Sequence, residues 1–291
     1  MEADRDPASQ STAVVSRPVA ADWLGFRREA DHRARQSSAH LVDRVSSWLR
    51  AGLGPHDAAV VIDLGAGTGS NQAWLAPRLQ VPQRWILLDH DADLLESSTA
   101  TDAEQVAATT RMVGSVDQLP QLMPAQAPAL VTCAALLDLL SARQTALIAE
   151  TISASGAAAV LSLTVTGEVS LTPADPVDQR IAAAFDAHQR RGDLLGPDAA
   201  ETLAAQLRDL GAHVELTQTD WLLDASRAEF VERYLRDRAQ AAAEFDPALA
   251  EAAAQWVQRR VQQLRRGELS VRVGHHDVVS VPDAPASASA G

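Results

Sequence analysis

The sequence predicts an α/β fold built on a doubly wound, mostly parallel sheet. The first observation is the stretch Val60–Ser70, in which apolar residues run into an acid and glycine then alternates with small residues. The second is Trp85–Asp89, another apolar run that ends in an acid. The third is the alternation of strand patterns with helical patterns, which is typical of parallel sheets covered by helices.

The first half of the chain carries these alternating patterns at short intervals. Residues 1–17 are rich in Ser, Ala, Asp and Pro, and this composition predicts disorder. Apolar spacing and turn residues then predict, in order, a helix over Asp31–Arg50, strands at Ala59–Leu64 and Trp85–Asp89, a helix from Asp91 to about Ala108, strands at Arg111–Gly114 and Ala129–Ala135, a helix over Ser141–Ser153 and a strand at Ala158–Val165.

The second half departs from simple alternation. Its patterns predict helices over Asp175–Arg191 and Pro197–Leu210, a strand at His213–Trp221, a helical pair over Ser226–Ala243 and Pro247–Arg266, and one long or bent strand from Leu269 to Val281. A second disordered tail is expected at residues 283–291. We therefore expect one domain over residues 18–282, with a helical insertion at about 225–267 before the last strand.

The glycine-rich turn carries most of the functional information. Gly65, Gly67 and Gly69 allow positive φ angles and a close approach of the backbone to a ligand. Asp63 lies at the carboxyl end of its strand, where open α/β sheets bind ligands. Asp89 lies 20 residues beyond Gly69, about where a nucleotide-binding fold places the acid that binds a ribose.

With these residues the sequence resembles the class I S-adenosylmethionine-dependent methyltransferases. Their first motif, (D/E)-x-G-x-G-x-G after a strand, is matched by Asp63, Gly65, Gly67 and Gly69, and their second by Asp89. The resemblance covers Val60–Val165 and extends to Pro282. It implies a seven-stranded sheet with an antiparallel last strand. A dehydrogenase fingerprint, G-x-G-x-x-G, is not matched, because the three glycines are each two residues apart.

The resemblance implies S-adenosyl-L-methionine as the cofactor and a set of residues that bind it. The backbone of the glycine turn would approach the methionine and ribose portions, Asp63 would orient the amino group, and Asp89 would accept from the ribose hydroxyls. An acid often follows strand three to face the adenine, and Ser115, Val116 and Asp117 compete for that role. The full set of expected cofactor residues is Asp63, Gly65, Ala66, Gly67, Gly69, Asp89, His90, Ser115, Val116, Asp117 and Thr132.

The acceptor site is less readable, because methyl transfer depends mainly on positioning. Glu168 is expected in a loop after strand five, and His188 could remove a proton from a hydroxyl or amine. These two are the candidate catalytic residues. The segment Trp23–Glu29 could close over the cofactor, with an arginine on its carboxylate, although packing of a helix lead-in also explains it. Strand four continues Thr132-Cys133-Ala134-Ala135-Leu136, without the Asn/Asp-Pro-Pro-Tyr/Phe motif of amino-group methylases.

The composition of the chain indicates which kinds of ligand the protein is not expected to bind. The net charge of -13 argues against nucleic acid, and the four arginines at positions 259, 260, 265 and 266 are expected on a solvated helix face. Cys133 is the only cysteine and reads as a buried apolar residue. Adjacent His275 and His276 would point to opposite faces of a strand, and no residue set has zinc spacing, so no metal is expected.

The absence of a membrane-length apolar run and of a signal-peptide pattern predicts a soluble, cytoplasmic protein. The preferred function is methyl transfer to a small organic acceptor, and a homodimer is compatible with it. Two alternatives stay open. One is a cofactor-binding scaffold without catalysis. The other is an aminopropyl transferase, which normally carries paired acids after strand four, where this chain has Asp138.

Overall fold

A computed structural model describes residues 21–98, 101 and 103–283 of the chain. The disorder expected at residues 1–17 falls outside this range, as does that expected at 283–291 apart from Asp283. Within the described part of the chain, no helix combines the length and the apolar composition that crossing a membrane requires.

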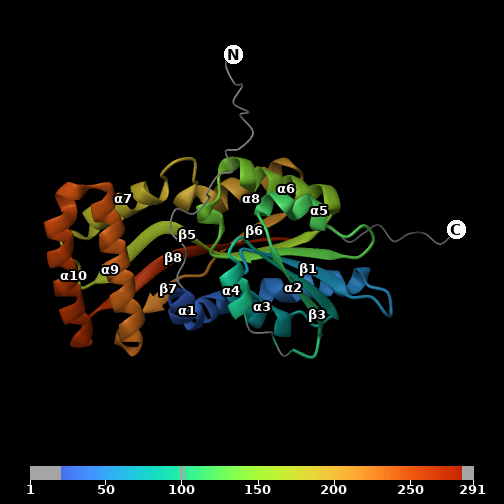
Figure 1. Cartoon of the computed structure of the whole chain (residues 1–291), viewed down its shortest axis with the longest axis horizontal. Coiled ribbons are helices and arrows are strands. Elements are labelled where there is room, and N and C mark those ends of the chain that lie inside the picture. The colour runs from blue at the N-terminus through green and yellow to red at the C-terminus, as the bar shows by residue number, and fades with distance from the viewer. Residues whose placement is uncertain (1–20, 99–100, 102, 284–291) are drawn as a thin grey trace, which may run out of the picture.

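A single twisted sheet forms the centre of the protein (Figure 1). Its strands are β1 (Ala59–Leu64), β2 (Gln83–Asp89), β3 (Val106–Val113), β4 (Ala129–Ala134), β5 (Ala158–Thr172), β6 (Val214–Gln218), β7 (Trp221–Leu223) and β8 (Ser270–Ser280). They are ordered β3-β2-β1-β4-β5-β8-β6, with the short β7 also paired to β8. Strands β1 to β5 are parallel, and β8 runs antiparallel to β5, β6 and β7. The expected parallel sheet with an antiparallel last strand is confirmed.

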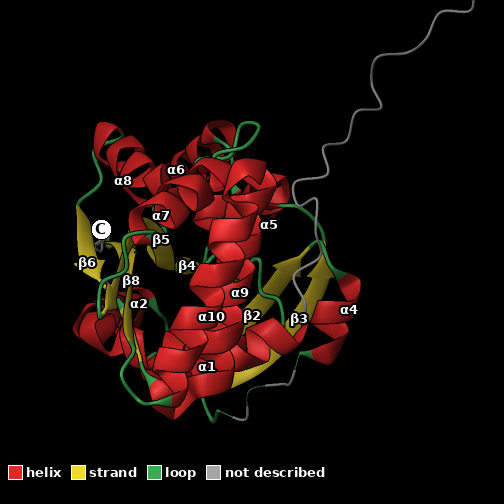
Figure 2. Ribbon diagram, turned by 90° about the vertical axis from the view of Figure 1, so that its left-hand side faces the viewer, coloured by secondary structure: helices red, strands yellow, loops and turns green. Residues whose placement is uncertain are grey.

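Helices cover both faces of the sheet and one of its ends. They are α1 (Ala21–Ala34), α2 (Ala39–Gly52), α3 (Ser70–Leu75), α4 (Ala92–Ser97), α5 (Leu119–Leu122), α6 (Ala142–Ser155), α7 (Asp178–Gln189), α8 (Ala199–Asp209), α9 (Ala228–Phe245) and α10 (Ala250–Arg265). Figure 1 shows α5, α6 and α8 on one face and α2 and α3 on the other, while α7, α9 and α10 stand beyond the ends of β5 and β8. Figure 2 shows α9 and α10 in front of the sheet when the molecule is viewed from that end.

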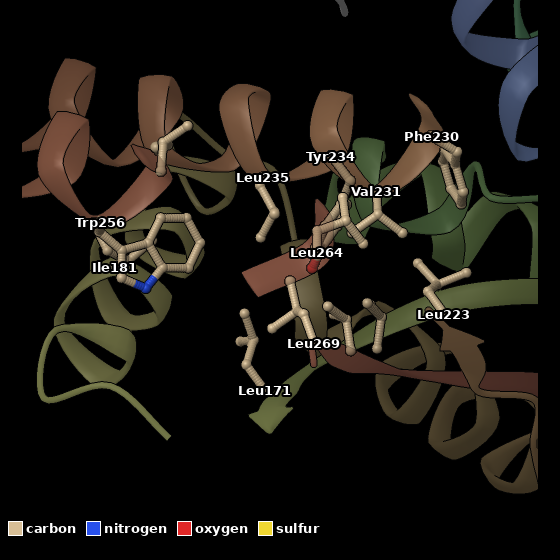
Figure 3. Close-up of a cluster of buried hydrophobic side chains, with 14 of the residues drawn as sticks. Leu171, Ile181, Leu223, Phe230, Val231, Tyr234, Leu235, Trp256, Leu264 and Leu269 are labelled. Atoms are coloured by element: carbon tan, nitrogen blue, oxygen red, sulfur yellow. The ribbon is translucent and has the colours of Figure 1, made fainter. Parts of the chain in front are cut away.

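Three clusters of buried apolar side chains hold these layers together. One joins the sheet to α6 and α8 through residues such as Ile148 and Leu203, and a second joins it to α2 and α3 through residues such as Val45 and Trp74. The third lies between α7, α9, α10 and the ends of β5 and β8 (Figure 3). The helical end of the molecule therefore has a hydrophobic core of its own.

The N-terminal helix differs from the expectation in its length and its break. Helical structure begins at Ala21, and a short 3-10 turn, Arg35–Ser38, separates α1 from α2. Arg35 is the first residue of this turn and lies inside the protein, with 1% of its surface exposed.

Two further expectations about elements are wrong. The helix expected from Asp91 to about Ala108 ends at Ser97, and β3 already begins at Val106, because pairing with β2 overrides the helical preference of Ala107 and Ala108. The strand expected to end at Val165 continues to Thr172, since β8 pairs with it from Ala159 to Thr172, with two register shifts on the way. Glu168 thus lies within β5 and not in a loop.

Candidate functional site

A cavity of about 710 Å³ opens at the carboxyl ends of β1, β2, β4 and β5. These ends flank the point where the strand order reverses between β1 and β4, which is where open α/β sheets bind ligands. Residues of the glycine turn, β2 and the loop after β3 line one half of the cavity. Residues of β5, α7 and α9 line the other half. A volume of this size is large enough for two small molecules or one large one.

The glycine turn forms the floor of the first half. Gly65, Gly67 and Gly69 all have positive φ angles, of 62°, 51° and 82°. A Cβ atom on Gly65 would lie 2.8 Å from the Leu136 side chain, and one on Gly67 would lie 3.2 Å from Leu24 of α1. Gly65, Ala66 and Gly67 line the cavity as expected, whereas Gly69 does not and instead caps α3.

Asp89 is held beside this turn by backbone amides. Its Oδ2 accepts from the Gly67 amide at 2.8 Å, and its Oδ1 accepts from the Asp91 amide at 2.9 Å. The carboxylate is almost fully buried and lines the cavity. His90 also lines the cavity, with its Nδ1 3.2 Å from Asp89 Oδ1. A fixed carboxylate at this edge can accept hydrogen bonds from ligand hydroxyls with its remaining lone pairs.

Asp63 and Thr132 lie one layer deeper than expected. Both are fully buried and neither lines the cavity. The Asn71 side-chain amide lies between them and the cavity, donating to Asp63 Oδ1 at 2.6 Å and to Thr132 Oγ1 at 3.0 Å. Burial raises the pKa of Asp63 to about 7, even though its hydrogen bond to Asn71 opposes the shift. Asp63 therefore acts on the cavity through Asn71.

Arg35 completes this network and is a residue that the sequence did not reveal. Its Nη1 donates to Asn71 Oδ1 at 2.8 Å, and its guanidinium lies 3.8 Å from the centre of the Trp74 ring. Its Nε and Nη2 have no hydrogen-bond partner among the described residues, and the side chain lines the cavity. Burial lowers the pKa of Arg35 from its usual value. A buried guanidinium with free donors is suited to a carboxylate of a ligand.

The loop after β3 borders the same half of the cavity. Ser115, Val116 and Asp117 all line it, so the structure places the three expected candidates together. The Ser115 hydroxyl donates to Asp117 Oδ2 at 3.0 Å, and Arg143 lies 3.0 Å from the other carboxylate oxygen of Asp117. These contacts fix the loop and leave Val116 as its apolar surface.

The two candidate catalytic residues do not meet in the structure. Glu168 lines the cavity, but its carboxylate is largely exposed and its Oε2 lies 3.4 Å from Arg272 Nη1. His188 is not among the lining residues. Its Nε2 lies 3.5 Å from Glu244 of α9, because α7 turns this side of its last turn toward that helix. The structure therefore does not bring His188 and Glu168 together at the cavity, and of the two only Glu168 lines it.

Asp138 is a better-placed acid. It follows β4 in a short 3-10 turn, Leu137–Leu139, and lines the cavity. Burial raises its pKa to about 6, and the charge of Arg27 partly offsets the shift. Acids whose pKa values approach neutrality through burial are common at catalytic sites. The sequence showed this residue only as an isolated acid.

Helix α1 covers the cavity from above the glycine turn. Trp23, Leu24 and Arg27 all line the cavity. This position is compatible with the idea that the N-terminal segment closes over a ligand. Arg27 is bound to Asp31 by its Nε at 2.8 Å, and the same carboxylate accepts from the Trp221 indole at 2.9 Å. The guanidinium of Arg27 is thus already paired.

The remaining polar groups of interest have structural roles. His275 is buried, and burial lowers its pKa to about 3. Among the described residues, no group of three or more His, Cys, Asp or Glu side chains could hold a metal ion. Cys133 is fully buried, as expected, and burial raises the pKa of its thiol.

The comparisons with known proteins are limited to structures. No protein-family model and no curated protein matches the chain. A cyclopropane-fatty-acyl-phospholipid synthase-like protein from Lactobacillus casei ATCC 334 is similar over 90% of this chain and 94% of its own, with 14% identity and a TM-score of 0.49. An S-adenosylmethionine-dependent methyltransferase from Thiobacillus denitrificans, solved with S-adenosyl-L-homocysteine, is similar over 91% of this chain and 100% of its own, with 14% identity and a TM-score of 0.43.

A third similar structure is that of the cyclopropane synthase MmaA2 from Mycobacterium tuberculosis, with 12% identity and a TM-score of 0.41 over 81% of this chain and 82% of its own. At these identities the likenesses concern the fold alone. The chain's own topology carries the assignment: five parallel strands in the order β3-β2-β1-β4-β5, followed in the sheet by the antiparallel β8 and then β6. That arrangement, with a glycine turn after β1 and an acid ending β2, is the fold of the class I S-adenosylmethionine-dependent methyltransferases.

Proposed function

We propose that the protein transfers a methyl group from S-adenosylmethionine to a small organic molecule bound in the same cavity. The observation that carries the proposal is the Asp89 carboxylate, which two backbone amides fix at the cavity edge beside the glycine turn. A ribose presents two adjacent hydroxyls, and a fixed carboxylate is the usual acceptor for such a pair.

The other lining residues fit the remaining parts of this cofactor. The apolar surface of Val116 and the polar groups of Ser115 and Asp117 suit an adenine and its amino group. Arg35, with two donors that lack partners, suits the carboxylate of the methionine portion. The buried Asp63 would act by fixing Asn71, whose side chain lines the cavity at the same place.

When bound, S-adenosylmethionine supplies a methyl group activated by the positive charge on its sulfur, and transfer is an in-line displacement by the acceptor. The chain's own contribution is to align the acceptor, exclude water and receive a proton. Asp138 lines the cavity, and its raised pKa suits it to accept a proton from a neutral nucleophile near neutral pH.

The alternatives have less support. An aminopropyl transferase would need a second acid beside the first after β4, and the turn Leu137–Leu139 carries Asp138 alone. A scaffold without catalysis does not account for a buried acid with a raised pKa in the cavity wall. Glu168 and Asp138 both line the cavity, and substitution of each in turn would compare their contributions to turnover.

Calorimetry tests the cofactor part of the proposal directly. S-adenosylhomocysteine should bind the wild-type protein, and NAD should give no heat. Asp89→Ala should weaken S-adenosylhomocysteine binding by about 10- to 100-fold, since hydrogen bonds to charged groups contribute roughly 1.5–3 kcal/mol. The matched control is Asp93→Ala, an exposed acid on α4 that does not line the cavity. NAD binding tighter than S-adenosylhomocysteine would refute the proposal.

A further inference from the structure

The far end of the cavity contains polar groups that methyl transfer itself does not require. Asp186 and Gln189 on α7 and Arg238 on α9 all line it. Each has one buried polar atom without a hydrogen-bond partner among the described residues: Asp186 Oδ1, Gln189 Oε1 and Arg238 Nη2. Buried polar groups are normally satisfied, so three such atoms on facing helices suggest that a ligand completes them.

Arg238 is the most constrained of the three. It has 4% of its surface exposed, and its guanidinium lies 4.2 Å from the centre of the Phe185 ring. Its Nη1 donates to the Tyr234 hydroxyl at 3.3 Å. Its Nη2 lies 3.9 Å from Asp186 Oδ1, which is near enough for electrostatic attraction but too long for a hydrogen bond. The arginine is thus held in place with a donor to spare.

Asp186 supplies the complementary acceptor. Burial raises its pKa, and the charge of Arg238 opposes the shift. The two side chains together present one donor and one acceptor side by side. The side-chain amide of Gln189 offers a further acceptor, or a donor if its oxygen and nitrogen are exchanged. It therefore adds to the donor and acceptor of Arg238 and Asp186 without adding a charge.

This arrangement selects against charged ligand groups. A carboxylate would accept from Arg238 but would face the oxygen of Asp186, and an ammonium would do the reverse. A neutral group with an acceptor next to a donor satisfies both. The aromatic side chains of Phe185, Trp221 and Tyr234 line the same part of the cavity and favour a planar molecule.

We propose that Arg238 and Asp186 bind the neutral amide edge (C=O next to N–H) of a planar acceptor, as found in carboxamides and heterocyclic lactams. The carbonyl accepts from Arg238 Nη2 and the N–H donates to Asp186 Oδ1. This subsite rests on the proposed function, because it assigns the acceptor's end of the same cavity. It places the acceptor's anchor on α7 and α9, apart from the residues assigned to the cofactor.

Four probes of one shape separate the alternatives: benzamide, acetophenone, benzoate and benzamidine. They present, respectively, an amide, an acceptor alone, an anion and a cation on the same ring. Their dissociation constants are measured by ligand-observed NMR with the wild-type protein, with and without saturating S-adenosylhomocysteine. Benzamide is expected to bind at least about 5-fold more tightly than each of the others.

Variants then locate the preference. Arg238→Met and Asp186→Leu should each abolish it, whereas Asp186→Asn, which keeps an acceptor oxygen, should retain most of it. Arg236→Met is the matched control, because Arg236 is an exposed residue of α9 that pairs with Glu232 and does not line the cavity. Circular dichroism checks that each variant is folded. If Asp186→Leu does not fold, Asp186→Asn and Arg238→Met still test the subsite.

The outcomes are distinct from those of the cofactor test. Tighter binding of benzoate or benzamidine, binding of none of the four, or a benzamide preference that survives Arg238→Met would overturn the subsite. Calorimetry of S-adenosylhomocysteine on the same samples reports the cofactor site separately, so failure there refutes the proposed function while the benzamide preference can still be measured.

Discussion

The carboxylate of Asp277 on β8 accepts the backbone N–H of Leu163 on β5 at 2.8 Å, across 114 residues of sequence. Leu163 has a φ angle of 59°, which a branched side chain adopts only when its surroundings enforce it. The register between β5 and β8 shifts at this point, and the Leu163 side chain lines the cavity. Asp277 thus stabilises a strained backbone position in the wall of the site.

Removal of that carboxylate should destabilise the protein strongly. Asp277 also accepts from the hydroxyls of Ser38 at 2.7 Å and Thr219 at 2.9 Å. Asp277→Ala therefore removes an acceptor shared by three buried donors, of which the Ser38 hydroxyl keeps the Arg35 carbonyl oxygen at 3.0 Å as an alternative. The expected loss is about 3 kcal/mol in the free energy of unfolding, measured with urea. Ser38→Ala removes only one of the three bonds to Asp277, together with the contact to the Arg35 carbonyl, and should cost about 1 kcal/mol. Equal losses for the two variants would show that the cluster does not act as proposed.

Arg35 should contribute directly to cofactor affinity. Arg35→Met should weaken binding of S-adenosylhomocysteine by about 10-fold or more, since a charged hydrogen bond to the carboxylate is lost. Binding of 5′-methylthioadenosine, which lacks the amino-acid portion, should not change. Arg78→Met is the control, because Arg78 also stacks on Trp74, 4.2 Å from the centre of its ring, without lining the cavity. A parallel loss for both ligands would assign Arg35 a structural role.

The titration of Asp138 should follow its surroundings. Its carboxyl should titrate near pH 6 in carbon-13 NMR spectra, and Arg27→Gln should raise this pKa further, because the positive charge of Arg27 favours the ionised form. Turnover that depends on ionised Asp138 should fall as the pH drops below about 6, and Asp138→Asn should remove this dependence. A titration near the ordinary value of 3.8 would exclude Asp138 as the proton acceptor.

His275 should make the protein sensitive to acid. Its pKa is about 3 in the folded protein against 6.5 for the free side chain, so the unfolded chain binds the proton more tightly. The stability that the neutral imidazole provides is therefore present above pH 6.5 and is lost as the pH falls toward 3, at roughly 1.4 kcal/mol per unit of pKa difference.

The change to test this is His275→Phe, which keeps an aromatic ring against Trp221, whose centroid lies 4.7 Å from that of His275. In urea unfolding, the His275→Phe variant should lose less stability between pH 7 and pH 5 than the wild type loses. Asp63 and Asp138 titrate in the opposite sense, and comparison between variants removes their common contribution. The exposed His56 supplies the control variant, His56→Gln. An unchanged difference between the two pH values would contradict the assignment.

The arginines near the end of α10 should not bind nucleic acid. Each is already close to an acid: Arg259 to Asp175, Arg260 to Asp178, Arg265 to Glu232 and Arg266 to Glu268. The expectation that all four lie on a solvated helix face is wrong for Arg260, which is fully buried where it binds Asp178. With a net charge of -13, the chain should not retard tRNA on a gel at physiological salt. Retardation that disappears as salt is added would instead reveal a phosphate-binding surface.

The parts of the site that sequence could predict are those encoded over short distances. The glycine turn and Asp89 depend on a strand that ends and a turn that follows, and both can be read from about thirty consecutive residues. Arg35 and Arg238 could not be found in this way, because each gains its role by burial against an element distant in the chain. Arg35 enters the site only through the break between α1 and α2, and no local pattern distinguishes it from the other arginines of that region.

The misplacement of Glu168 and His188 has a similar origin. The length of β5 is set by its pairing with β8, which lies about a hundred residues later in the chain. The apolar pattern, which ends at Val165, therefore predicted a strand that is too short. The direction of His188 depends on where α9 packs, and the periodicity of α7 alone does not reveal it.

The separate hydrophobic core beneath α7, α9 and α10 has a consequence for how this protein can change. Substitutions among its members, such as Phe230, Leu235 or Trp256, would shift the helices that carry Asp186 and Arg238 while the cores that support the glycine turn stay intact (Figure 3). If the proposed function holds, preference for one acceptor over another can therefore change without loss of the proposed cofactor site. A new specificity could be introduced by exchange of one helical layer while the half of the cavity that carries the glycine turn is retained.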